Sequence, residues 1–76
     1  MVDVIEGFPS WVKIGASFSL FFSERNPNNI QKIHVRGFVD GRVVLSRWRN
    51  NKQYWHYWVE DDFWFEVYKD KIVNIK

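Results

Sequence analysis

The sequence contains no cysteine, only two prolines and only four glycines among its 76 residues. Without cysteine, neither a disulfide framework nor a thiolate metal site can supplement the core of so small a domain. Apolar runs are also short: the longest, residues 16–22, is interrupted by Ser17 and Ser19 and cannot span a bilayer. The first residues lack the positive region and apolar run of a signal peptide. These absences predict a cytoplasmic protein without a membrane contact, a bound metal or a cofactor.

Aromatic residues are abundant instead. Five Trp, seven Phe and three Tyr make up 20% of the chain. Aromatic side chains bury a large area per residue, and a chain this rich in them is not disordered. At this length the chain forms one domain. We therefore expect a single small β domain over residues 1–76, with a lead-in segment over 1–15 and a meander over 16–76.

The first strand is predicted by alternation. Ala16, Phe18, Leu20 and Phe22 would share one face of a strand over about residues 16–23. A Pro and three Asn mark residues 24–29 as a loop.

From residue 31 onward, turns recur every eight to twelve residues, so the pattern favours hairpins and no helix of useful length. Asp40-Gly41 is the strongest hairpin signal, because a type I′ turn needs positive φ at both central residues. Asn50-Asn51 and Asp61-Asp62 mark two further reversals. Residues 72–76 would form a closing edge strand that pairs with the first strand or with an edge of the meander.

The expected fold class is therefore all-β. In strand count, turn spacing and length, the pattern resembles the small SH3-like and Tudor-like barrels or an oligonucleotide/oligosaccharide-binding (OB-like) barrel. The alternative is a strongly coiled antiparallel meander of five to six strands.

Two-residue turns at Asp40-Gly41 and Asn50-Asn51 fix a register, and the register divides the side chains between two faces. The predicted inner face is apolar and holds Ile33, Val35, Val39, Val44, Trp48, Trp55, Tyr57, Val59, Phe63, Phe65 and Val67. The predicted outer face mixes cations with aromatics and holds His34, Arg36, Arg47, Arg49, Lys52, Tyr54, His56, Trp58, Trp64, Glu66 and Tyr68.

Three apolar residues, Phe38, Val43 and Leu45, do not fit the outer face on which this register places them. A terminal segment can cover one corner of a curved sheet, and residues 1–10 are the obvious candidate. Gly37 lies mid-strand, where a bulge or bend would let the sheet coil.

Charge is distributed unevenly along the chain. Six basic and only two acidic residues lie between residues 31 and 60, although the net charge of the whole chain is +2. Such a segment is consistent with a surface that faces a polyanion. The sequence therefore predicts a nucleic-acid-binding module. Arg36, Arg47, Arg49 and Lys52 would contact phosphates, and Tyr54, Trp58 and Trp64 would stack on bases.

A protein- or peptide-interaction module is the alternative, because exposed Trp, Tyr and Arg are enriched in interface hot spots. A homodimer that hides Trp58 and Trp64, or an aromatic cage for a cationic side chain, belongs to this alternative. Catalysis is not expected. A His56–Glu66 pair is conceivable, but there is no phosphate loop, nucleophile elbow or metal-ligand spacing.

Overall fold

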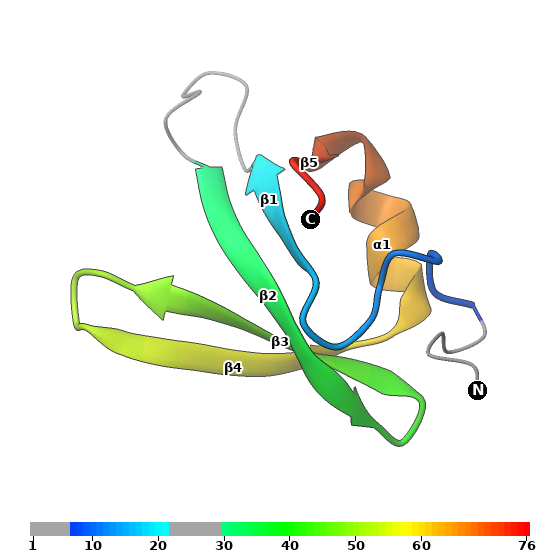
Figure 1. Ribbon diagram of the computed structural model, residues 1–76, viewed down its shortest axis with the longest axis horizontal. Coiled ribbons are helices and arrows are strands. Elements are labelled where there is room, and N and C mark those ends of the chain that lie inside the picture. Colours follow the sequence, from blue (N-terminus) through cyan, green and yellow to red (C-terminus); the bar gives the residue numbers. More distant parts are fainter. Residues whose placement is uncertain (1–6, 22–29) are drawn as a thin grey trace.

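A computed structural model of the chain describes residues 7–21 and 30–76 (Figure 1). Five strands form one antiparallel sheet in the order β4-β3-β2-β1-β5. The elements are β1 (Ser17–Phe21), β2 (Ile30–Val39), β3 (Arg42–Arg49), β4 (Tyr54–Glu60), the helix α1 (Asp62–Tyr68), the 3-10 turn η1 (Lys69–Lys71) and β5 (Ile72–Val73). The all-β prediction is confirmed. Of its two forms, the described residues adopt the open antiparallel sheet and not a closed barrel.

The two terminal strands lie where the sequence predicts them. Phe18 and Leu20 are buried on one face of β1, with the buried Ala16 just before the strand, and Leu20 pairs with Ile72 of β5. The closing strand therefore pairs with the first strand, one of its two predicted partners, but it covers residues 72–73 and not the predicted 72–76. The predicted end of the first strand at residues 22–23 and the predicted loop at residues 24–29 lie outside the described residues.

The β2–β3 hairpin confirms the predicted turn and the predicted bend. Asp40 has a φ of 51° and Gly41 a φ of 74°, which are the positive values that a type I′ turn needs. A register shift then occurs between Val35 and Gly37. The uninterrupted register predicts that Val35 lies opposite Ser46. Because the bulge inserts one extra residue into β2, Val35 instead lies opposite Leu45.

This bulge inverts the predicted faces of β3. Ile33 and Val35 are buried as expected, but the extra residue brings Val43 and Leu45 beside them, and both are completely buried. The predicted inner face is therefore wrong for β3 and β4. Of its members in these two strands, Trp48, Trp55, Tyr57 and Val59 are exposed and Val44 is half-buried. Val39, at the end of β2, was also predicted to face inward and is 47% exposed.

The β3–β4 connection also differs from the two-residue turn predicted at Asn50-Asn51. It spans residues 50–53, with Gln53 at a φ of 54° and its N–H donating to the Arg49 carbonyl at 2.7 Å. Trp55 consequently pairs with Trp48 instead of Ser46. The pairing of β4 with β3 is therefore shifted by two residues from the prediction. Because side chains alternate with a period of two, residues of β3 and β4 that were predicted to share a face of the sheet still share one.

Residues 62–68 form a helix where the sequence predicted a strand with Phe63, Phe65 and Val67 on its inner face. Asp61 caps the helix: its Oδ1 accepts a hydrogen bond from the Trp64 N–H at 3.3 Å. Phe65 is 3% exposed, whereas Phe63 is 67% exposed. Packing of Trp64, Phe65 and Tyr68 against the core decides the outcome, because that spacing is helical and outweighs local β preference.

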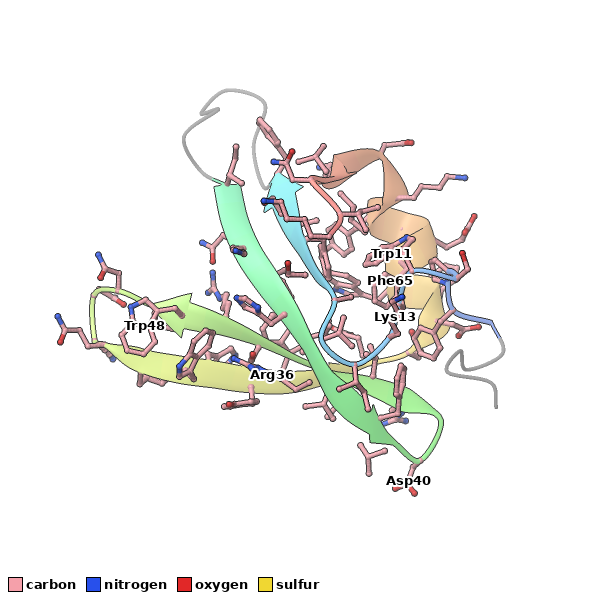
Figure 2. All side chains as sticks on the ribbon, in the orientation of Figure 1. Trp11, Lys13, Arg36, Asp40, Trp48 and Phe65 are labelled. Carbon is pink, nitrogen blue, oxygen red and sulfur yellow. The ribbon has the colours of Figure 1, made fainter. Side chains whose placement is uncertain are left out.

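The core lies between the sheet, α1 and the N-terminal segment, which Figure 1 shows running beside α1. Phe65 is at its centre, with ring centroids 5.6 Å from Phe8, 5.7 Å from Trp11 and 6.1 Å from Phe18. Figure 2 shows Trp11 and Phe65 close together. The Phe8 ring also lies 5.9 Å from Phe38, so the predicted cover of the misfit corner is confirmed for Phe8. Residues 1–6 lie outside the described residues.

Replacing the helix cap tests the local account of α1. We expect Asp61→Ala to lower the free energy of unfolding by about 1 kcal/mol, because the Trp64 N–H loses its side-chain acceptor. Asp61→Asn keeps a capping oxygen and should retain most of that stability. Urea denaturation of the three proteins measures the difference. Equal stability of Asp61→Ala and the natural chain would contradict the assigned cap.

Candidate functional site

Cations and aromatics meet on the concave side of the β3–β4 hairpin, the side that faces α1. Cross-strand pairs place Arg49 opposite Tyr54, Arg47 opposite His56 and Leu45 opposite Trp58. Ring centroids lie 6.4 Å apart from Tyr54 to His56 and 5.5 Å apart from His56 to Trp58, the latter pair stacked. We call these residues the basic-aromatic strip: Arg47, Arg49, Tyr54, His56 and Trp58.

A groove lies between this strip and the helix. It has a volume of about 390 Å³ and is lined by Leu20, Arg47, His56, Trp58, Glu60, Trp64 and Tyr68. The stacked His56 and Trp58 rings come from the strip, whereas Trp64 and Tyr68 come from successive turns of α1, with their rings 5.0 Å apart. We call this hollow the aromatic groove. Aromatic rings from both β4 and α1 line it, so a flat ligand could contact rings from two elements.

A second hollow opens where β2 and β3 diverge. Pairing of these strands ends at Ile33–Arg47, and Figure 1 shows their ends splaying apart beyond that point. The hollow measures about 470 Å³ and is lined by Ile30, Gln31, Lys32, His34, Arg47, Trp48, Arg49, Asn50 and Asn51. No acidic residue is among them, so we call it the cationic cleft. Arg47 lines both the cleft and the aromatic groove.

Within residues 7–21 and 30–76, no carboxylate lies within 4 Å of a cation of the cleft. In the described part of the chain, the ion pair within 4 Å is Lys69–Glu66, on α1 and η1. Burial lowers the pKa of Arg47, and the positive charge of Arg49 lowers it further. Burial also lowers the pKa of His34, with additional contributions from Arg36 and Lys32. The positive charges around Arg47 and His34 create a positive potential that favours an anionic ligand.

Glu60 is the one acidic residue that lines the aromatic groove. Burial raises the pKa of its carboxyl group and the neighbouring Asp61 charge adds to this effect, whereas a hydrogen bond from the Trp58 side chain opposes it. The carboxylate is thus partly desolvated beside two aromatic walls. It can accept hydrogen bonds from N–H groups at the edge of a ligand held between those walls.

The structure brings together most of the seven residues that the sequence singled out. Arg47, Trp58 and Trp64 line one groove, Arg49 lines the adjoining cleft, and Tyr54 lies on the strip. Lys52 is exposed in the turn at the tip of the hairpin.

The predicted location of these residues is corrected in two respects. They lie on the concave side and not on an outward face, and Trp58 and Trp64 are half-buried against the core. Arg36 is on the opposite face. Its Nε donates to Ser46 Oγ at 2.7 Å, and its guanidinium lies 4.6 Å from the centre of the Trp55 ring. The bulge causes this separation, because it reverses the phase of β2 relative to β3.

Three contributors to the site were not among the seven candidate residues. Lys32 lines the cationic cleft, and Glu60 and Tyr68 line the aromatic groove. Trp64 and Tyr68 are four residues apart, and residues at this spacing lie on the same side of a helix. The signal that could have identified Tyr68 is therefore a helix over residues 62–68, which the sequence did not predict.

The structure does not form the conceivable acid–base pair. His56 lies on the concave strip, whereas Glu66 on α1 forms an ion pair with Lys69 at 3.4 Å. Within residues 7–21 and 30–76, no group of three or more His, Asp or Glu side chains is arranged to hold a metal ion. Nor does that part of the chain contain a helix long and apolar enough to cross a membrane.

Comparisons with protein-family models, with curated proteins and with solved structures found no match to this chain.

The electrostatics of the cleft can be tested through His34. We expect its imidazole to titrate below the ordinary value of 6.5 and expect Arg36→Ala to raise that pKa only partway, because burial is the larger cause. Since the unfolded chain takes up this proton more readily, the free energy of unfolding should fall as the pH drops through the interval just below 6.5. Histidine proton shifts followed by NMR measure the pKa. An unchanged or lower value in Arg36→Ala would contradict the proposed repulsion.

Proposed function

We propose that this domain binds single-stranded nucleic acid along the concave side of the β3–β4 hairpin. The observation that carries the proposal is that Arg47 lines both hollows, so that a cationic cleft and an aromatic groove adjoin. Each nucleotide has an anionic phosphate and a flat base, and the two hollows offer a complement to each. Arg47 and Arg49 on the hairpin, together with Lys32 on the β2 side of the cleft, would contact phosphates, while Trp58, Trp64 and Tyr68 would contact a base.

Single strands fit this arrangement better than duplexes. Stacking on aromatic side chains requires an exposed base face, which a duplex buries within its own stack. Stacking contributes about 1–3 kcal/mol per base and tolerates different sequences. The proposal therefore includes weak sequence preference and leaves DNA and RNA as alternative ligands.

The proposal is one of binding and not of catalysis. The side chains that could act as a general acid or base do not lie together: His34 and His56 are on opposite faces of the sheet, and Glu66 forms an ion pair with Lys69. The cytoplasmic location predicted from the lack of cysteine is part of the same proposal, because nucleic acid is abundant there.

A salt series with fluorescent oligonucleotides tests the proposal. We expect a labelled single-stranded oligonucleotide to bind at low salt and log K to fall linearly with log salt concentration, with a slope of about −0.7 for each phosphate contact. The matching duplex should bind more weakly at every salt concentration. The absence of single-strand binding at low salt, or tighter binding of the duplex, would refute the proposal.

A further inference from the structure

Strand β4 lies at one edge of the sheet. It pairs with β3 on one side only, and no other strand within residues 7–21 and 30–76 lies beside its second side. Figure 1 shows this free edge of β4, in yellow, running along the margin of the fold. Natural edge strands usually carry lysine, proline or a bulge that blocks pairing with another chain. The sequence of β4, Tyr54–Glu60, contains neither lysine nor proline, and its register with β3 has no shift.

A row of apolar side chains accompanies this unpaired backbone. Trp55, Tyr57 and Val59 point away from the concave side and are between 39% and 55% exposed. Trp48, on the adjacent strand, widens the row, with its ring 5.5 Å from that of Trp55. Addition of a strand to a sheet needs free backbone groups together with side chains that can pack across the new pair. The β4 edge offers both.

We propose that β4 pairs with β4 of a second copy of this chain, antiparallel and about a two-fold axis. The register that covers the full strand is centred on Tyr57, which then lies opposite Tyr57 of the second copy. Trp55 of each copy packs against Val59 of the other, so the exposed row is complementary to itself. Two-fold pairing of this kind closes after two copies and joins the sheets into one.

Charges at the two ends of β4 favour this orientation. The N-terminal end follows Arg49 and Lys52, whereas the C-terminal end carries Glu60, Asp61 and Asp62. Antiparallel pairing brings the basic end of each copy to the acidic end of the other, and it does so twice by symmetry. Parallel pairing would instead bring like charges together, which is unfavourable.

The dimer leaves the concave side accessible. Trp55, Tyr57 and Val59 pack side by side across the new strand pair, whereas the basic-aromatic strip lies on the opposite face of the joined sheet. The inference is therefore independent of the ligand that the strip binds. In the dimer, two strips are carried by one continuous sheet.

Disulfide cross-linking tests the register directly, because the natural chain has no cysteine. Opposed residues in antiparallel strands have Cα atoms about 4.5–5.5 Å apart, which a disulfide can bridge. We expect Tyr57→Cys to form covalent dimers under mild oxidation at micromolar concentration. Val39→Cys is the control, because Val39 is similarly exposed but lies at the end of β2. Equal cross-linking of the two variants, or none in Tyr57→Cys, would overturn the register.

Sedimentation equilibrium tests the dimer without a covalent bond. We expect the natural chain to show a monomer–dimer equilibrium, and Val59→Lys to raise its dissociation constant by about tenfold or more, since lysine blocks edge pairing. Val39→Lys, at a site that is 47% exposed compared with 43% for Val59, should leave the constant unchanged. Circular dichroism of both variants verifies the fold. A natural chain that stays monomeric from micromolar to millimolar concentration would overturn the dimer and leave the edge to a strand from a different protein.

Discussion

Phe65→Ala should destabilise the domain by about 3–5 kcal/mol, the range measured when a buried phenylalanine is truncated. Its ring is surrounded by those of Phe8, Trp11, Phe18 and Trp64, with centroids 4.9–6.1 Å away. Removing it opens a cavity between the helix, the sheet and the N-terminal segment, which its neighbours can fill only in part. Since small domains have total stabilities near the low end of about 5–15 kcal/mol, much of the variant should be unfolded at moderate temperature.

The matched control is Phe63→Ala on the same helix. Phe63 is 67% exposed, so we expect its truncation to change stability by less than about 0.5 kcal/mol. Thermal and urea denaturation of both variants give the comparison. The pair also distinguishes helix from strand, because a strand over residues 62–68 would place Phe63 and Phe65 on the same face. Similar losses for the two variants would contradict α1.

Arg47→Glu should raise the dissociation constant for a single-stranded oligonucleotide by about 10- to 100-fold, equivalent to about 1.4–2.8 kcal/mol. Arg47 lines both hollows, so the substitution replaces a phosphate contact with a repulsive charge at the point where the proposed base and phosphate sites adjoin. Loss of the contact should also reduce the magnitude of the salt slope by about one. Fluorescence anisotropy at several salt concentrations measures both quantities.

Arg42→Glu makes the same change of net charge at the opposite end of β3. Arg42 is exposed beside the Asp40-Gly41 turn and does not line the cleft or the groove. We expect it to weaken binding only through the long-range field, and therefore less than Arg47→Glu at every salt concentration. Equal effects of the two variants would show that net charge, and not the site around Arg47, determines binding. Circular dichroism confirms that both variants are folded.

The sequence predicted the fold class because alternation and turn chemistry are local properties. Alternation of Ala16, Phe18 and Leu20 is visible over a few residues, and the positive φ values at Asp40-Gly41 follow from the residues themselves. The first strand, the type I′ hairpin and the closing edge strand were predicted on these grounds and are confirmed.

The assignment of faces failed because one inserted residue has a non-local effect. The sequence predicts a bulge or bend at Gly37, but the predicted register of β2 and β3 contains no extra residue, whereas the structure has one between Val35 and Gly37. With the bulge included, Val43 and Leu45 join Ile33 and Val35 in the core, and their apparent misfit disappears. The helix was missed for a related reason, since packing against the core and the Asp61 cap outweighed the alternation of residues 63–67.

The grouping of candidate residues was preserved despite these errors. Arg47, Arg49, Tyr54 and Trp58 were assigned to one face, and they share one because the turn at residues 50–53 shifts the register by two residues. Trp64 also lines the aromatic groove, but it does so from the helix α1, which the sequence did not predict. Only Arg36 lies on the opposite face, because it is at the bulge.

The most direct test of the proposed site is a nucleic-acid titration followed through tryptophan indole N–H signals in two-dimensional NMR. The chain has five tryptophans on different surfaces. We predict that a short oligothymidine shifts the signals of Trp58 and Trp64, which line the aromatic groove, and leaves the signal of Trp55, on the face opposite the concave side, nearly unchanged. Shifts confined to Trp55, or no shifts at saturating oligonucleotide, would contradict binding on the concave side.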